Sequence, residues 1–238
     1  MEGTIVNTVA VLVGGLAGLR LRRRLPERMR ETVMQAIGLA TLLIGVQMAL
    51  QTRNVLGIIV SLALGAVIGE GLHIEEGLED LGQWAERRLG GGDGQQTFAS
   101  AFVTSSLLFC VGPLTLLGAI QDGLGQPPTL LYTKSLLDGI SSVAIGAALG
   151  AGVLLSAVTV LVYQGVITLA AGLLQRLMTP EMTRELTATG GMLIVGLGLG
   201  ILQIRRIRVG SLLPALLVSI GVTIAAPSLS ALARALGL

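Results

Sequence analysis

The sequence predicts an all-α, polytopic transmembrane helix bundle with about eight spans. Two inverted three-helix repeats would be joined by a two-helix hairpin, with an amphipathic helix on the surface. Composition predicts the membrane location: of 238 residues, 52% are hydrophobic and 13% are charged, and the mean hydropathy is +0.81. A soluble domain of this length could not bury so much apolar surface, so we expect the lipid bilayer to cover it.

An internal repeat predicts the inversion. A pattern in the first half of the chain recurs about 153 residues later, after an odd number of predicted crossings. A second copy placed in this way lies upside down in the bilayer, as in many secondary transporters, which bind their substrate near the midplane between the copies. The recurring pairs are Gly18 and Gly172, Arg22 and Arg176, Pro26 and Pro180, Arg30 and Arg184, Glu31 and Glu185, and, after a one-residue slip, Gly38 and Gly191, Gly45 and Gly198, Gly57 and Gly210.

Eight apolar segments approach the roughly 20 residues that a membrane span needs. They are residues 4–20, 32–51, 54–72, 97–120, 130–150, 152–175, 184–204 and 209–228. The turn between the fifth and sixth segments is little more than 150–152. The predicted units are 1–72 for the first repeat, 73–96 for the surface helix and its linker, 97–150 for a central polar hairpin, and 151–238 for the inverted second repeat.

The segment 73–88 predicts the surface helix. Its apolar residues recur at helical spacing among many acidic and basic residues, which makes it amphipathic but too charged to cross a bilayer. These apolar residues are Ile74, Leu78, Leu81 and Trp84. The glycine-rich stretch 90–94 lacks the lysine and hydroxyl residue of a phosphate-binding loop, so we interpret it as a flexible linker.

The distribution of positive charge predicts the orientation. In the eight-span arrangement, eleven arginines fall on the side of the first loop and five lysines or arginines on the opposite side. By the positive-inside rule, the first loop is cytoplasmic and both termini lie outside. The more basic loop is the first in one repeat and the second in the other, as an inversion requires.

Glycines four residues apart predict close helix packing, because such faces let two helix backbones touch in a membrane. The pairs are Gly14 and Gly18, Gly65 and Gly69, Gly146 and Gly150, and Gly196 and Gly200. We expect packing within the bundle, and a homo-oligomer formed through one of these faces is the alternative.

The fifth predicted span carries an ion pair. Lys134 and Asp138 are four residues apart, which places the ammonium and the carboxylate on one helix face. Counted from residue 130, Asp138 would lie roughly 12 Å deep, near the membrane midplane. Because ionisable groups at this depth are costly, we expect the pair to line a polar cavity. The alternative is a buried pair that only neutralises itself.

The fourth predicted span is interrupted at Gly112 and Pro113. Proline lacks a backbone donor, so a carbonyl near residue 109 would need another partner. Transporters often present backbone groups to ions or substrates in this way. We expect Asp122, just beyond the break, to face the fifth-span pair, and Gln164 to approach it from the middle of the sixth span.

Three further polar residues give weaker indications. Asn7 lies in the first span, where an amide more often forms a hydrogen bond across helices than contacts a substrate. Glu70 and His73 lie one turn apart at the end of the third span and could form a proton-sensing or metal pair. At that depth we expect instead a hydrated carboxylate and imidazole.

Motifs along the chain resemble a family of bacterial membrane proteins, domain of unknown function 554 (DUF554), over essentially its whole length. These motifs are Gly3-Thr4-Ile5-Val6-Asn7, Gly112-Pro113 with Gly118 and Asp122-Gly123, Lys134-Ser135 with Asp138-Gly139, and Gln164-Gly165. The resemblance implies an integral protein of the bacterial cytoplasmic (inner) membrane, with transport as the suggested role and without a defined substrate.

Several other functions are disfavoured. The single histidine and single cysteine cannot form a zinc site of the usual composition. No nucleophile elbow, zinc-protease motif or phosphate-binding loop is found, so we expect neither an enzyme nor a cofactor. The arginines flank apolar segments, which indicates membrane orientation and not nucleic-acid binding.

We therefore expect a small secondary transporter or channel for a small polar or ionic solute. The candidate binding residues are Asn7, Gly112, Pro113, Asp122, Lys134, Ser135, Asp138 and Gln164. The mechanism would be alternating access, with the two repeats rocking about the polar hairpin. The alternative function is a membrane scaffold or sensor that does not transport and whose segment 73–88 docks a partner.

Overall fold

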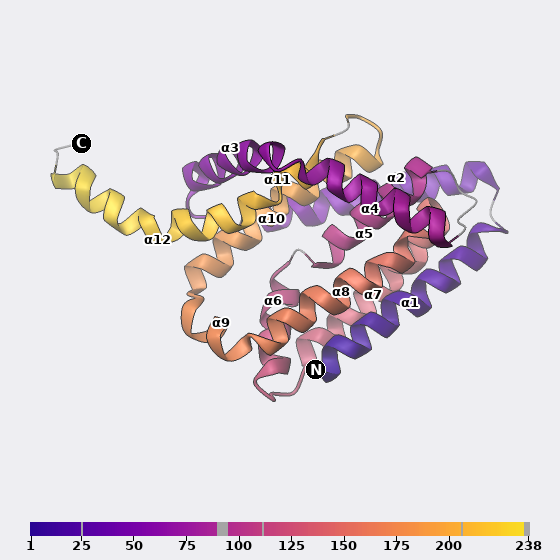
Figure 1. Cartoon of the computed structure of the whole chain (residues 1–238), viewed down its shortest axis with the longest axis horizontal. Helices are drawn as coiled ribbons and strands as arrows, with labels where there is room; N and C mark the ends of the chain where they lie inside the picture. The colour runs from indigo at the N-terminus through magenta and orange to yellow at the C-terminus, as the bar shows by residue number, and fades with distance from the viewer. Residues whose placement is uncertain (25, 90–94, 111, 206, 236–238) are drawn as a thin grey trace.

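The computed structural model describes residues 1–24, 26–89, 95–110, 112–205 and 207–235, which form helices and short connections (Figure 1). The all-α prediction is confirmed for these residues. The helices are α1 (Glu2–Arg22), α2 (Glu27–Ala49), α3 (Val55–Gly71), α4 (Ile74–Leu89), α5 (Gln95–Cys110), α6 (Pro113–Gly123), α7 (Thr129–Leu149), α8 (Gly152–Leu169), α9 (Ala171–Leu177), α10 (Pro180–Ile201), α11 (Val209–Leu212) and α12 (Pro214–Ala235).

Local sequence explains several helix ends. The Asn54 side chain accepts a hydrogen bond from the amide of Gly57 at 2.9 Å and caps α3. Thr179 caps α10 in the same way, and Pro180 occupies the first turn, where its missing N–H costs nothing. Gly150 ends α7 with a φ of 97°, which glycine adopts without strain. The tight turn predicted at 150–152 is therefore confirmed.

Three of the predicted spans are interrupted. The fourth consists of α5 and α6, which are bent by 63° around the Gly112-Pro113 break. The predicted sixth span, 152–175, ends as α8 at Leu169 and resumes as α9. The predicted last span, 209–228, is divided into α11 and α12. The predicted linker 90–94 lies outside the described residues.

Within the described residues, three helices are long and apolar enough to cross a membrane: α1, α2 and α8. The count rises to four if the bent α5–α6 pair is one span. Helix α3 and the segment Val209–Ala225 are apolar but shorter. Helices α7 and α10 have 21 and 22 residues, but charged side chains make them less apolar. The predicted total of eight spans stays a prediction.

Two of the four predicted glycine faces, Gly14 with Gly18 and Gly65 with Gly69, pack against backbone inside the bundle, whereas a Cβ atom on Gly200 would meet nothing within 4 Å. Helix α1 lies along α7 (Figure 1). A Cβ atom added to Gly14 would lie 2.2 Å from the carbonyl oxygen of Gly139, and one added to Gly18 would lie 2.4 Å from that of Val143. The two backbones are therefore in direct contact, and only glycine fits at these two positions of α1.

Helices α2 and α10 form a second close pair, although they are far apart in sequence. Gly38 lies against Leu202, at the end of α10, whereas Gly45 lies against Val195, about two turns earlier. The two helices are therefore antiparallel. Helix α3 is likewise antiparallel to the segment α11–α12, because Gly65 packs against Ala215 and Gly69 against Ser211.

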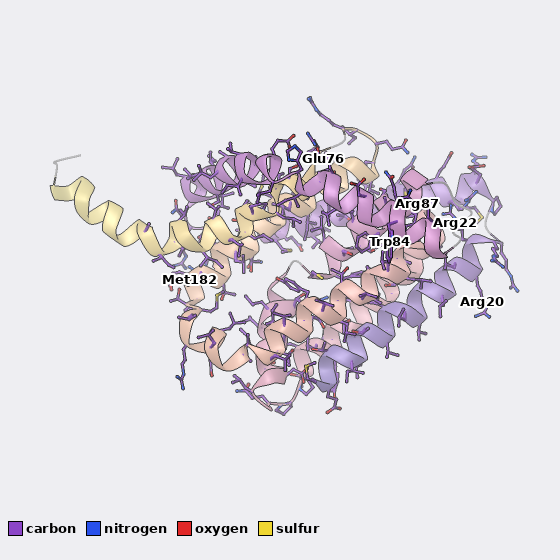
Figure 2. All side chains as sticks on the ribbon, viewed as in Figure 1. Arg20, Arg22, Glu76, Trp84, Arg87 and Met182 are labelled. Atoms are coloured by element: carbon purple, nitrogen blue, oxygen red, sulfur yellow. The ribbon has the colours of Figure 1, made fainter. Side chains whose placement is uncertain are left out.

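Helix α4 is the predicted amphipathic segment. Its acidic first turn is held by α11 and the residue before it: Glu75 accepts a hydrogen bond from the amide of Gly210 at 2.7 Å, and Glu76 pairs with Arg208. Trp84 is 53% exposed. Figure 2 shows Arg87 of α4 toward the same end of the molecule as Arg20 and Arg22 of α1.

Candidate functional site

The predicted ion pair is formed and buried between α1 and α7. The Lys134 ammonium pairs with Oδ2 of Asp138, one turn further along α7. Asn7 of α1 donates from Nδ2 to the same oxygen at 3.0 Å. The exposed fractions are 5% for Lys134, 7% for Asp138 and 0% for Asn7. The close approach of α1 to α7 at Gly14 brings Asn7 into reach of the carboxylate.

Two polar atoms beside this pair have no hydrogen-bond partner in the described structure. They are Oδ1 of Asn7 and Oγ of Ser142, which lies one turn beyond Asp138 on the same helix. Both residues are 0% exposed. A buried polar atom without a partner costs free energy, so such atoms mark places where a water molecule, an ion or a solute would be stabilised.

Gln164 is the most unusual polar residue of the site. It is 0% exposed, and neither its oxygen nor its nitrogen has a partner among the described residues. Thr168, one turn further along α8, contacts Thr4 of α1, with 3.1 Å between their hydroxyl oxygens. Because α1 and α8 are antiparallel, Gln164 lies at the level of Thr8. Helix α1 is therefore flanked by the ion pair on α7 and by this amide on α8.

Asp122 belongs to a neighbouring cluster and not to the Lys134 pair, contrary to the expected juxtaposition. One carboxylate oxygen accepts from the amino group of Met1 at 2.9 Å. The other accepts from the backbone amide of Thr4 at 3.1 Å and from its hydroxyl at 3.2 Å. The sequence motifs do not indicate the contact between Asp122 and the Met1 amine, although Thr4 lies in the first family motif. Asp122 thus ties the start of α1 to the end of α6.

The carbonyl group that loses its helical hydrogen bond at the break is satisfied by another residue of the protein. The carbonyl oxygen of Phe109 accepts a hydrogen bond from the Thr115 hydroxyl at 3.1 Å, so the bond lost at Pro113 is replaced by a side chain of α6. A carbonyl oxygen has a second lone pair, which remains for a ligand. A Cβ atom added to Gly112 would meet nothing within 4 Å, so the backbone there faces open space. The Ser135 hydroxyl donates to the carbonyl of Leu131 in its own helix.

Glu70 does not pair with His73. Its carboxylate binds Arg208 with one oxygen and accepts from the Ser211 hydroxyl at 3.0 Å with the other. These partners come from the second half of the chain, so spacing along the third span could not indicate them. Within the described residues, no group of three metal-ligating side chains is found.

Comparison with known proteins places the chain in a family. The chain matches the family described as Protein of unknown function (DUF554) over residues 2–224. It belongs to the DUF554 family. The uncharacterized protein YqgA of Escherichia coli (strain K12) is 33% identical over 220 residues, or 91% of this chain and 94% of YqgA.

A second DUF554 relative carries a membrane description. The uncharacterized membrane protein YdfK of Bacillus subtilis (strain 168) is 31% identical over 223 residues, or 92% of this chain and 93% of YdfK. No solved structure matches the chain. The predicted family is confirmed, and with it an integral membrane protein that has bacterial homologues.

The chemistry available in this DUF554 site is that of polar binding. A carboxylate and an ammonium lie in a low-dielectric setting, where electrostatic interactions are stronger than in water. The unpartnered amide of Gln164 offers both a donor and an acceptor, and Asn7 and Ser142 add two oxygens. A small solute or ion would find charge and hydrogen bonds here, close to the helix break.

Proposed function

We propose that the protein is a secondary carrier for a small polar or ionic solute, and that it works by alternating access between two inverted repeats. The observation that carries the proposal is the set of unpartnered buried atoms on α1, α7 and α8, the helices that hold or flank the Lys134–Asp138 pair: Oδ1 of Asn7, Oγ of Ser142 and both amide atoms of Gln164. A purely structural core would leave few such atoms without partners. A site that alternates between empty and occupied states can leave such atoms for the solute to satisfy.

Reciprocal contacts between α2 and α10 support the inverted repeat. The offset of 153 residues makes Leu42 equivalent to Val195, and Gly45 equivalent to Gly198. Gly45 packs on Val195, and Gly198 packs on Leu42. Each contact therefore becomes the other when the two repeats are exchanged. A two-fold axis in the membrane plane would produce this relation.

A second exchanged pair of contacts has the same offset. Gly38 packs on Leu202, and Gly191 packs on Ala49. The equivalent helices of the two repeats are antiparallel in each case: α1 to α8, α2 to α10, and α3 to α11–α12. A repeat placed in the same orientation in the bilayer would give parallel equivalents. These contacts favour the inverted arrangement that the charge pattern predicts.

The roles of individual residues follow from their contacts. Asp138 would bind a proton or a cation, and Lys134 would neutralise Asp138 in the empty state or meet an anionic group of the solute. Asn7 holds the carboxylate oriented through its Nδ2 hydrogen bond. Gln164 would supply paired donor and acceptor contacts, and the Phe109 carbonyl a further acceptor. Asp122 would keep the start of α1 attached to the hairpin as the repeats move.

Reconstitution tests this function. The purified protein in proteoliposomes is exposed to a panel of amino acids, carboxylates and alkali cations, with a pH-sensitive dye and radiolabelled solutes as readouts. We expect a solute that enters against its gradient with the unsubstituted protein and not with Asp138→Asn. Thr133→Ala is the matched control, because Thr133 is exposed on α7 beside the ion pair and donates only to its own helix.

The scaffold or sensor alternative predicts a different result. No solute of the panel would move, Asp138→Asn would behave like Thr133→Ala in cells, and loss of the 73–88 segment would abolish function. A carrier predicts that Asp138→Asn loses uptake even when uptake is divided by the amount of folded protein, because the substitution also lowers stability by leaving Lys134 buried without its partner. Uptake that survives Asp138→Asn would remove this residue from the mechanism.

A further inference from the structure

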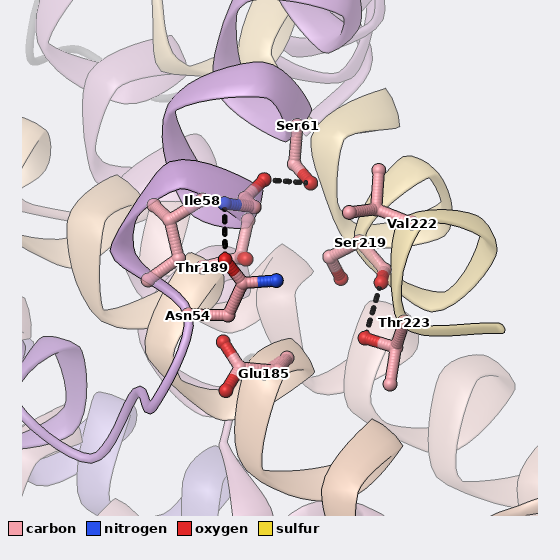
Figure 3. A pocket seen from close by; sticks show the side chains of 9 residues that line it. Asn54, Ile58, Ser61, Glu185, Thr189, Ser219, Val222 and Thr223 are labelled. Atoms are coloured by element: carbon pink, nitrogen blue, oxygen red, sulfur yellow. Dashed lines mark hydrogen bonds between the residues drawn. The ribbon is translucent and has the colours of Figure 1, made fainter. Parts of the chain in front are cut away.

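A small polar cleft lies outside the proposed solute site, where α3, α10 and α12 meet (Figure 3). It is narrow and leaves no room for a free water molecule, so it is far smaller than the usual pocket for an organic ligand. The polar residues that line it are Asn54, Ser61, Glu185, Thr189, Ser219 and Thr223. Motif reasoning did not single out any of them as a site residue.

The hydroxyl groups of the cleft are arranged as acceptors. Ser61 donates its proton to the carbonyl of Gly57 at 2.7 Å, Ser219 donates to Leu216 at 2.8 Å, and Thr223 donates to Ser219 at 2.8 Å. Because these protons are used within the helices, the hydroxyl oxygens can offer only lone pairs to a ligand. Such oxygens suit a cation.

Thr189 gives an independent indication of a ligand. Its hydroxyl has no hydrogen-bond partner, although the residue is 0% exposed and lines the cleft. A buried hydroxyl without a partner is costly unless something else occupies the site.

Glu185 supplies the single formal charge among the residues lining the cleft. Its two oxygens accept from the Thr52 hydroxyl at 2.6 Å and from the backbone amide of Arg53 at 3.0 Å, which fixes the carboxylate and leaves further lone pairs. The Oδ1 atom of Asn54 caps α3, which leaves it one lone pair. One carboxylate with neutral oxygens matches one positive charge, whereas divalent sites usually gather several carboxylates.

We propose that this cleft binds a monovalent cation of the size of sodium, held by the Glu185 carboxylate and the hydroxyl oxygens of Ser61, Thr189, Ser219 and Thr223. Hard cations of this kind prefer oxygen ligands. The cleft joins α3 of the first half to α10 and α12 of the second, so a bound ion stabilises the contact between the halves. The site stands whether or not the protein transports a solute.

The test is ion-dependent thermal stability of the full-length protein in a non-ionic detergent. Sodium chloride is compared with choline chloride at equal ionic strength, and binding is counted directly with radioactive sodium. A ligand that binds only the folded state raises the melting temperature. We expect a sodium-specific rise that disappears in Glu185→Gln.

Two further variants keep the test decisive. Thr189→Val removes a hydroxyl that has no partner, so it should fold normally while raising the half-saturating sodium concentration by about tenfold or more. Glu181→Gln, on an exposed position one turn earlier on α10, should respond like the unsubstituted protein. Equal stabilisation by sodium and choline, or a full sodium response in both Glu185→Gln and Thr189→Val, would overturn the proposal.

The same experiment separates this site from the proposed carrier function. Asp138→Asn should lose solute uptake and keep the sodium-dependent rise, because Asp138 lies between α1 and α7. Failure of every uptake assay would therefore count against the carrier and not against the cation site. Absence of the sodium response would count against the cation site and not against the carrier.

Discussion

Gly45 of α2 and Gly191 of α10 face each other reciprocally. A Cβ atom on Gly45 would lie 2.9 Å from the carbonyl oxygen of Gly191, and one on Gly191 would lie 2.7 Å from that of Gly45. The two halves of the chain thus meet backbone to backbone at this point. Van der Waals packing, and not side-chain chemistry, holds them together there.

This contact predicts an unequal effect of two similar substitutions on one helix. Gly191→Ala should lower the free energy of unfolding by about 1–3 kcal/mol, because the new methyl group would meet backbone atoms of α2. Gly200→Ala, where a Cβ atom would meet nothing within 4 Å, should be neutral or stabilise by up to about 1 kcal/mol. Denaturation in mixed detergent micelles measures both. Equal stability of the two variants would contradict the packing described.

The Lys134–Asp138 pair predicts non-additive stability. Lys134→Met alone leaves a buried carboxylate without its partner and should destabilise by about 3–5 kcal/mol. The double variant Lys134→Met with Asp138→Asn removes both charges and should recover most of that loss. A double-mutant cycle of unfolding free energies gives the coupling directly. Additive effects would show that the two groups do not interact.

Gln164 predicts a separation of stability from function. Its amide makes no hydrogen bond in the described structure, so Gln164→Leu should leave the melting temperature unchanged or raise it. Uptake in proteoliposomes should fall strongly, since the proposed solute contacts are lost. Gln175→Leu, on an exposed position of α9, is the matched control for the change in side chain. A fall in stability with normal uptake would assign Gln164 a structural role.

Cys110 is the single cysteine of the sequence, and it can report on the helix break. It is 6% exposed and packs in a buried cluster with Val11, Phe109 and Ile145. N-ethylmaleimide should therefore label it slowly in the resting protein and rapidly after denaturation in SDS. If the bend at Gly112 opens during transport, a transported solute should accelerate labelling. Fast labelling of the resting protein would show that the cluster is open.

The attachment of α4 predicts a dependence on pH. A hydrogen bond from its own backbone amide, with the positive charges of Arg208 and His73, holds the pKa of Glu76 below its usual value. A lowered carboxyl pKa stabilises the attachment above the ordinary Glu pKa, about 4, and this contribution is lost as the pH falls through the lowered value. The fluorescence of Trp84, the single tryptophan, should change over that range.

Two variants in the α10–α11 connection test whether protonation of Glu76 causes this fluorescence change. Arg208→Gln should give the low-pH fluorescence already at neutral pH, because its contacts with Glu70 and Glu76 are gone. Arg205→Gln, exposed in the same connection, should keep the transition of the unsubstituted protein. If Arg208→Gln showed the same fluorescence transition as the unsubstituted protein, Glu76 would not be the group that causes it.

The local features of the fold could be predicted from sequence because their causes are local. The helical spacing of Lys134 and Asp138, the amphipathic segment and the glycine turn at 150 each depend on a few neighbouring residues. The break after Leu169 could not be predicted, because Ala170 carries neither the ring of proline nor a charge. Contacts across the chain, such as Asp122 with Met1 or Glu70 with Arg208, depend on packing that no single segment encodes.

In the proposed inverted repeat, the helices that would be equivalent differ in shape. Helix α1 runs unbroken from Glu2 to Arg22, whereas its counterpart is divided at Ala170 into α8 and α9. If both halves can adopt either form, exchanging the two forms generates a second conformation of the whole molecule. In that conformation α1 would bend near Leu16, the position equivalent to Ala170, while α8 and α9 would straighten into one rod. A spin-label pair spanning Leu16 would detect this shortening of α1.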